Sequence, residues 1–311
     1  MDAIASIPGA PRTVRISRLV APIFAIAMAL LPPAAPAGNA PADPVHPHRP
    51  KTLALPPEIQ LPKYTPGPMP FREGERLTYA ASWLGVPAAQ AQIELHQAPR
   101  NPELWVGEAT LASSKTVDVI YKMRDYMQER FAKESFEPRR MDIRQRERHR
   151  HDDYTVTFDR AQGVVAMQKT GPRGIQLKRF AASNPWGMMS GAALALSQPL
   201  KVGDQVELDL FSATNRYVLS FHVTARERLQ TPLGAADALK IEPWVVYMSD
   251  GKMRSQARAT TIWVSDDARK LPLRIESATF IGTIRIDLVK VDNLHAKPAA
   301  TAPKESDGSG R

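Results

Sequence analysis

The residues with the clearest metal-binding chemistry stand together near the middle of the sequence: His149, His151, Asp152 and Asp153. Histidines at alternate positions lie on one face of a strand, as they do in some zinc sites. Arginines interleave this cluster, however, and their positive charge opposes a bound cation. We therefore expect a solvated turn at Asp152 and Asp153, with no metal and no cofactor.

Two pairs of acidic residues could perform general acid–base catalysis if their carboxyl groups converged. Asp266 and Asp267 are adjacent, so on a strand they would point to opposite faces, and a turn suits them better. Glu73 and Glu75 flank a glycine and have no base or nucleophile beside them. The sequence also contains no nucleophile elbow, phosphate-binding loop or dinucleotide fingerprint. We therefore expect a protein that is not an enzyme.

Arginines recur at every second position in one predicted strand, which places them on one face. This basic stripe consists of Arg144, Arg146, Arg148 and Arg150. It could contact phosphate or carboxylate groups, because a guanidinium pairs with both. The alternative is a solvated sheet face, where long charged side chains keep the strand soluble. Arg144, Arg146 and Arg148 are candidate ligand-binding residues.

The segment from Asn184 to Leu200 predicts the main helix of the protein. It has almost no polar face, and a helix that is apolar all round is normally buried. Trp186, Met188 and Met189 could line a lipid pocket, since methionine adapts to varied surfaces. Packing in the core against a curved sheet is the alternative role for these three residues.

Most other segments are predicted strands, because apolar and polar residues alternate along them. Residues 260–277 form the clearest hairpin, with the Asp266–Asp267 turn between two alternating runs. Pro272 cannot donate a ladder hydrogen bond, so it should begin a strand at a sheet edge or leave its position unpaired. Long strands joined by short turns predict a mainly β fold, one large antiparallel sheet that is strongly twisted or barrel-like. The helix would cover or plug that sheet.

The two ends of the chain have the composition of segments outside the fold. Residues 1–37 resemble a signal peptide, with a basic region, an apolar run from Leu19 to Leu31 and a small-residue cleavage site. An uncleaved anchor is the alternative. The remaining divisions are a proline-rich disordered linker at 38–70, a β domain at 71–294 and a disordered tail at 295–311. We expect export to the periplasm.

The composition narrows the partners further. The 311 residues include no cysteine, so disulfides, thiolate metal sites and cysteine nucleophiles are excluded. The formal net charge of +9 at pH 7 suits anionic partners. For an exported protein these would be lipid, lipopolysaccharide or an anionic glycan, reached by peripheral contact with the envelope, and we expect no nucleic acid.

Aromatic, glycine, proline and acidic residues recur in a recognisable order along the predicted domain. They are Phe71, Gly74, Glu75, Leu77, Tyr79, Trp83, Asp125, Pro138, Phe158, Asp159, Pro199 to Gly203, Ile262 to Asp267, Arg269, Leu271, Pro272 and Arg274 to Glu276. In this order the chain resembles, from about residue 71 to 288, a bacterial family known as domain of unknown function 3108 (DUF3108). The resemblance implies an exported envelope protein with a β-rich, barrel-like fold and no established activity. Family members often have an aspartate where the buried helix starts, and here that segment is Asn184, Pro185 and Trp186.

These observations predict a non-catalytic periplasmic protein that binds a component of the cell envelope, either a lipid or an anionic glycan. Two other hypotheses remain: a hydrolase or lyase that acts on cell-wall or other polysaccharide, and a structural scaffold of an envelope complex. An open apolar cavity would favour lipid binding. Two converging buried acids would favour an enzyme, and a filled barrel with an exposed patch would favour a scaffold.

Overall fold

The computed structural model describes residues 51–53, 61–148, 150–182, 184–213, 215–249, 252–256, 260–279 and 282–293. The predicted signal peptide and C-terminal tail lie outside this part of the chain. No helix in the described ranges is long and apolar enough to cross a membrane.

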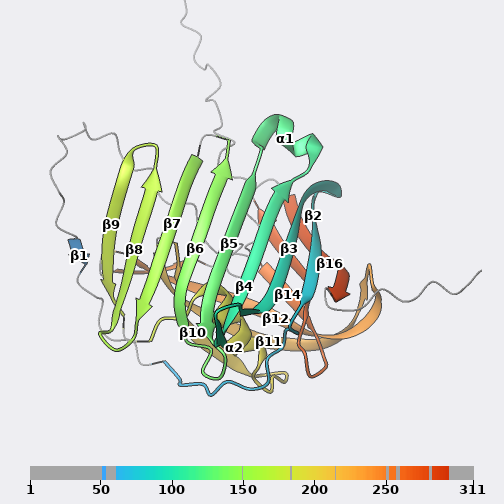
Figure 1. The fold of residues 1–311 in the computed structure, drawn as a ribbon. Helices are drawn as coiled ribbons and strands as arrows, with labels where there is room; N and C mark the ends of the chain where they lie inside the picture. The colour runs from blue at the N-terminus through green and yellow to red at the C-terminus, as the bar shows by residue number, and fades with distance from the viewer. Residues whose placement is uncertain are drawn as a thin grey trace, which may run out of the picture.

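One 16-stranded sheet dominates the described structure (Figure 1). Its order is β1-β9-β8-β7-β6-β5-β4-β3-β2-β16-β15-β14-β12-β11-β10, and β13 pairs with β12 off this path. Strand neighbours are antiparallel, except that β1 (Lys51–Leu53) runs parallel to β9 (Gly174–Ala181) at one edge. The prediction of a mainly β protein with one large antiparallel sheet is therefore confirmed, although the sheet remains open.

The sheet folds over into two layers, which Figure 1 shows one behind the other. The front layer is a meander of consecutive strands: β2 (Glu75–Trp83), β3 (Val86–Ala98), β4 (Asn101–Ser113), β5 (Arg124–Ala132), β6 (Pro138–Glu147), β7 (Arg150–Asp159), β8 (Val164–Gly171) and β9. The back layer comprises β10 (Gln205–Ser212), β11 (Asn215–Thr231), β12 (Gly234–Ser249), β13 (Lys252–Gln256), β14 (Thr260–Ser265), β15 (Pro272–Thr279) and β16 (Gly282–Asn293). Pairing of β16 with β2 joins the layers.

Two helices accompany the sheet in the described ranges. α1 (Lys115–Tyr121) connects β4 to β5 at one end of the front layer, and no residue of α1 is buried. α2 (Met188–Leu196) contacts both β5 and β10, and all its residues except Ala192 are buried. The prediction of a buried, apolar helix is confirmed. The helix is shorter than expected, however, since it begins at Met188 instead of Asn184 and ends at Leu196 instead of Leu200.

The segment before α2 forms a seam between the two layers. The Ala182 amide donates to the Gly163 carbonyl oxygen at 2.8 Å, which ties the start of the segment to the β7–β8 turn. Further along, the Trp186 amide donates to the Asp209 carbonyl oxygen at 2.7 Å, and the Phe211 amide donates to the Trp186 carbonyl oxygen at 2.8 Å. Because Trp186 pairs with the edge strand β10 in this way, its backbone is extended and the helix starts only after it.

The hairpin expected at residues 260–277 is present as β14 and β15. Asp267 makes its turn, because its Oδ1 accepts from the backbone amides of Arg269 at 2.9 Å and Lys270 at 3.1 Å. Pro272 begins β15 and lies opposite Val264, where the register shifts. The turn follows the sequence prediction. Pro272 begins a strand as predicted, but β15 lies between β14 and β16 instead of at a sheet edge, and Pro272 is without a ladder partner only on the β16 side.

One predicted turn is wrong. Asp152 and Asp153 lie inside β7, where they pair with residues of β6. The chain reverses earlier, around Arg148, whose φ of 26° is in the left-handed region. The sequence favoured the aspartates because their side chains bond local backbone readily, but here those side chains pair with cations across the sheet instead.

The predicted disordered linker at 38–70 overlaps the structured part of the chain. Residues 61–70 lie along the domain: the Gly67 amide donates to Ser197 Oγ at 3.1 Å, and the Glu207 amide donates to the Tyr64 hydroxyl at 2.9 Å. Tyr64 and Met69 pack against the hydrophobic core. β1 also falls within the predicted linker.

Candidate functional site

A groove opens on the outer face of the back layer because β12 changes partners along its length. Its first part pairs with β14 through residues Ala238 to Ile241, and its last part pairs with β13 from Val245 onward. The groove lies over the stretch of β12 between these two pairings, where Glu242, Pro243 and Trp244 line it. The resulting groove has a volume of about 980 Å³, which is at the upper end of the range of about 300–1,000 Å³ that is typical of small-molecule sites.

Most residues that line the groove are polar, and the lining comes from six strands. It consists of Gln205 and Glu207 of β10; Val218, Ser220, His222 and Thr224 of β11; Glu242, Pro243 and Trp244 of β12; Thr260 and Thr261 of β14; Glu276 and Ala278 of β15; and Thr283 of β16. Most of the exposed surface inside the groove is nonetheless apolar, so hydroxyl, amide and carboxyl groups lie among apolar atoms. Hydroxyls can donate and accept, whereas ionised carboxylates only accept.

Trp244 is the large aromatic residue of this groove, and 46% of its surface is exposed. The strand register explains its position. Leu219 and Phe221 face the core from β11, so the side chains that alternate with them point outward, and Trp244 pairs with the outward Ser220. An exposed indole presents a flat apolar face with negative electrostatic potential, against which C–H groups of a ligand can pack.

Each carboxylate of the groove has a partner beside it, either a cation or a side-chain amide. Glu276 pairs with Arg285 at 2.7 Å and Glu242 pairs with Lys240 at 3.0 Å. Glu207 accepts from the Gln205 amide at 2.8 Å. Because these cations are already paired with acids, the groove offers hydrogen-bond acceptors to a ligand and little free positive charge.

A second polar group of residues lies on the inner face of the front layer. Asp125 is buried beside Glu147, and burial together with the Glu147 charge raises the pKa of Asp125 to about 7. The backbone amide of Arg146 donates to Asp125 Oδ1 at 2.8 Å, and the Tyr121 hydroxyl donates to Glu147 Oε2 at 2.7 Å. These are two buried acids that converge, one carrying a proton near neutral pH.

Cations and an amide complete this inner cluster. Asp152 accepts from Arg150 Nε at 3.0 Å and pairs with Lys169 Nζ at 2.9 Å. Gln145 lies between Asp125 and Asp152 in the sheet, and its buried Oε1 has no hydrogen-bond partner in the described part of the chain. The inner cluster thus combines acidic side chains, cationic side chains and one hydrogen-bond acceptor without a partner.

The fully buried Glu129 of β5 binds the N-terminus of α2. Its carboxylate oxygens accept from the backbone amides of Met189 at 2.7 Å and Ser190 at 3.2 Å. Burial raises the pKa of Glu129, and the helix amides that bond it act in the opposite direction. This contact fixes the start of the helix, since those first amides have no partner within the helix.

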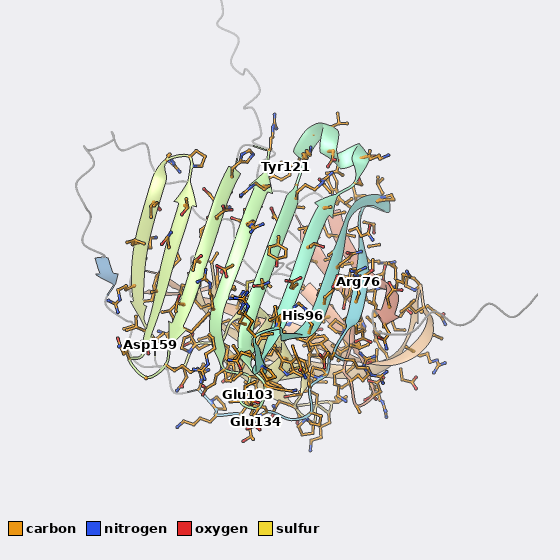
Figure 2. All side chains as sticks on the ribbon, in the orientation of Figure 1. Arg76, His96, Glu103, Tyr121, Glu134 and Asp159 are labelled. Atoms are coloured by element: carbon orange, nitrogen blue, oxygen red, sulfur yellow. The ribbon has the colours of Figure 1, made fainter. Side chains whose placement is uncertain are left out.

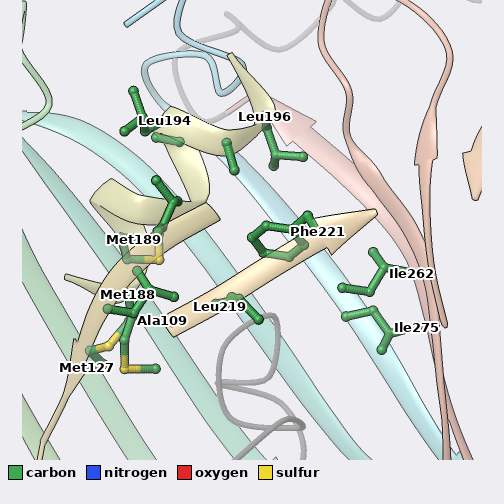
Figure 3. Close-up of a cluster of buried hydrophobic side chains, with 14 of the residues drawn as sticks. Ala109, Met127, Met188, Met189, Leu194, Leu196, Leu219, Phe221, Ile262 and Ile275 are labelled. Atoms are coloured by element: carbon green, nitrogen blue, oxygen red, sulfur yellow. The ribbon is translucent and has the colours of Figure 1, made fainter. Parts of the chain in front are cut away.

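Figure 3 shows the methionines of α2 within the packed core. Met188 and Met189 are buried, and Met189 fills the space next to Gly107 of β4. Trp186 is half-buried, with the Arg160 guanidinium 4.4 Å from its ring centre. The cavity that borders α2 is apolar and measures only about 20 Å³. Ligand binding by these three residues stays a prediction.

The structure separates the four arginines that the sequence placed on one face. Arg144 lies over the Tyr126 ring at 5.6 Å, and Arg146 pairs with Asp153 at 2.6 Å. Arg148 is exposed in the β6–β7 turn. Arg150 faces inward, since its Nη2 donates to the buried Tyr154 hydroxyl at 2.7 Å. The predicted common face is therefore wrong for Arg150, because the turn at Arg148 reverses the chain before it.

Of the histidine cluster, His149 lies outside the described residues, whereas His151 is exposed on β7. In the described ranges, no three histidine, cysteine, aspartate or glutamate side chains come together as a metal site.

The groove and the inner cluster were both missed by sequence reasoning. An outward-facing tryptophan in the alternating run of β12 was the available signal for the groove. The sequence identifies Asp125 only as one of the residues that carry the family resemblance. Its partner Glu147 comes from the next strand, so their convergence depends on the register of that pairing.

The fold and the groove define a mainly β protein with an open, folded-over sheet around one buried helix. Residues 78–289 match the family described as protein of unknown function (DUF3108), so the chain belongs to this family. No relative among the curated proteins matches it.

Solved structures with related strand arrangements have little sequence in common with this chain. A β-barrel-like protein of domain of unknown function DUF1849 from Brucella abortus has a TM-score of 0.46 and 9% identity, over 70% of this chain and 96% of that one. An exported protein with a YmcC-like fold from Bacteroides fragilis has a TM-score of 0.34 and 12% identity, over 74% of this chain and 98% of that one.

Proposed function

We propose that this protein is exported to the cell envelope and binds a glycan there, in the groove beside Trp244, without catalysing a reaction. The exposed Trp244 in a groove lined by many hydroxyl, amide and carboxyl side chains is the observation that carries the proposal. A sugar ring has an apolar C–H face and a rim of hydroxyls. The indole would pack against the C–H face, and the hydroxyl and carboxyl side chains of the groove would form hydrogen bonds with the sugar hydroxyls.

Two features of the structure argue against the two ligands expected from the sequence, an acyl lipid and an anionic glycan. An acyl chain needs an apolar pocket, and the apolar cavity next to α2, at about 20 Å³, is too small for one. An anionic glycan needs free cations, and the groove instead contains Glu207, Glu242 and Glu276. A neutral or amino sugar fits these acceptors better. The location in the envelope rests on the signal-peptide features of residues 1–37.

We predict that Trp244→Ala weakens glycan binding at least tenfold, because loss of a central aromatic contact typically costs about 2 kcal/mol or more. The measurement is isothermal titration with a soluble hexamer of N-acetylglucosamine, a neutral envelope-type sugar. The matched control is Trp263→Ala, which removes another outer-face tryptophan outside the groove and should keep the affinity of the unmodified protein. Equal binding by the Trp244→Ala variant would contradict the proposal, as would tight binding of a polyuronate in place of the neutral oligomer.

A second candidate is the hydrolase or lyase hypothesis, which the converging acids Asp125 and Glu147 favour. Two acids that flank a glycosidic bond are the groups that glycoside hydrolysis uses. These acids face the inside of the sheet, whereas the groove lies on the outer face. A catalytic role would therefore require a different ligand site from the one proposed here.

A further inference from the structure

The turns of the front layer lie at its two ends, and these two ends differ in their exposed side chains. In an antiparallel meander, alternate turns lie at the same edge, so the β2–β3 turn, α1, the β6–β7 turn and the β8–β9 turn share one edge. Figure 1 shows them together at the top of the front strands. We call this the α1 edge. The β3–β4, β5–β6 and β7–β8 turns form the opposite edge.

Exposed apolar side chains gather at the α1 edge. Six of the ten large exposed hydrophobic residues of the described structure belong to it: Leu84 (66% exposed), Val86 (53%), Val119 (87%), Ile120 (60%), Ile175 (64%) and Leu177 (50%). None of the ten lies in the turns of the opposite edge. None of the residues of α1 is fully buried, and Tyr121 alone of them packs against the core. Apolar residues concentrated on one exposed edge indicate contact with another surface.

The charges at the two edges also differ. Lys115, Lys122, Arg148 and Arg173 are exposed at the α1 edge, and none of them forms an ion pair with another described residue. The acid of α1, Asp118, is half-buried and is already paired with Arg124. The turns of the opposite edge carry both signs of charge: Glu103, Glu134 and Asp159, which Figure 2 labels at the bottom of the front strands, alternate with Arg100, Lys133 and Arg160. The α1 edge is therefore both apolar and basic.

We propose that the α1 edge docks on an anionic phospholipid surface. Aliphatic side chains on turns and on a short helix can enter the boundary between head groups and acyl chains. Unpaired lysine and arginine side chains are attracted by the negative surface potential of such a membrane. A protein partner would need a shaped interface, whereas these residues are spread over four separate turns along the whole edge.

The direction of β1 supports this orientation. β1 runs parallel to β9, and β9 starts at the α1 edge, so the N-terminal end of β1 at Lys51 is directed toward that edge. The sequence before Lys51 contains the apolar run from Leu19 to Leu31. If this run is retained as an anchor, it would be connected to the sheet at the end of β1 that is directed toward the α1 edge. The groove beside Trp244, on the back layer, is not part of the docking surface.

The test is flotation of the full chain with vesicles of phosphatidylglycerol and phosphatidylethanolamine, compared with vesicles of phosphatidylcholine. A charge variant, Lys115→Gln, Arg148→Gln and Arg173→Gln, should lower the partition coefficient on anionic vesicles about a hundredfold at low salt, at about fivefold per charge. An apolar variant, Val119→Gln, Ile120→Gln, Ile175→Thr and Leu177→Thr, should lower it at both low and high salt.

The matched control replaces exposed apolar residues away from this edge, Val202→Gln and Leu233→Thr, which are each 52% exposed. It should bind vesicles as the unmodified chain does. The proposal is overturned if the control loses as much binding as the apolar variant, if both edge variants bind normally, or if neutral vesicles bind the chain equally well. Unfolding midpoints confirm that each variant is folded. Glycan titration of the edge variants should be unchanged, which separates this proposal from the groove.

Discussion

At the scale of single residues, the buried acid Asp125 is a group whose protonation differs between the folded and unfolded chain near neutral pH. Its pKa is raised from 3.8 to about 7 by burial and by Glu147. Between these values the folded protein holds a proton that the unfolded chain has released. Because the folded state then binds more protons, its stability falls as the pH rises through this interval.

Asp125→Asn should remove the part of this pH dependence that Asp125 contributes, while Glu129, whose pKa burial also raises, keeps its own contribution. For the unmodified protein, we expect the free energy of unfolding to fall by on the order of 2–4 kcal/mol between pH 4 and pH 8, at about 1.4 kcal/mol per unit of pKa difference. The variant cannot titrate there, so its curve should be flatter. Urea unfolding at several pH values gives both curves, and identical slopes would contradict the assignment. If the inner cluster is catalytic, the same variant should lose any glycan cleavage.

Residue types on the inner face of a strand can be predicted from the sequence, but their partners across strands cannot. Asp125 and Glu147 meet because the β5–β6 pairing sets Tyr126 opposite Arg144. That register depends on the turn between the strands and on the bulge next to Phe131. Shifting the register by one residue would send one of the two acids to the other face.

At the scale of elements, α2 shows why the ends of a helix are harder to predict than its burial. The apolar composition predicted a buried helix, and that is confirmed. Its start is fixed by Glu129 of β5, far away in the sequence, and by the extended pairing of Trp186. Gly187 allows the close approach, since a Cβ there would lie 2.1 Å from Glu129 Oε1.

The packing around α2 leads to a prediction for Met189→Trp. The Met189 side chain already fills the space beside Gly107, where an added Cβ would lie 2.9 Å from its Cε. We expect overpacking to lower the free energy of unfolding by about 1–3 kcal/mol, whereas the volume-conserving Met189→Leu should cost less than about 1.5 kcal/mol. Chemical unfolding compares the two variants. A stable tryptophan variant together with lipid binding by the unmodified protein would instead reveal an acyl pocket at the helix.

At the scale of the whole molecule, the local meander could be predicted, but the folding of the sheet into two layers could not. Short turns join most neighbouring strands, so alternation and turn residues are sufficient for the hairpins. The pairing of β16 with β2 and the seam at β10 join segments from opposite ends of the domain. No local sequence pattern specifies such contacts, and they determine where the groove, the inner cluster and the α1 edge lie relative to one another.

The seam depends on one fully buried aromatic residue of β10. Phe211 has its ring centre 4.9 Å from that of Phe180 on β9 and 6.3 Å from that of Phe158 on β7, so it holds the two free ends of the sheet together. We expect Phe211→Ala to lower the free energy of unfolding by about 3–5 kcal/mol, as truncation of a core phenylalanine does. Amide exchange should speed up most in β8, β9 and β10, while the β14–β15 hairpin keeps more of its protection, because local opening follows the contacts that are lost. Phe131→Ala, a core truncation within the front layer, is the control. If both variants accelerate exchange in the same strands, the sheet unfolds as one unit and the seam has no separate role.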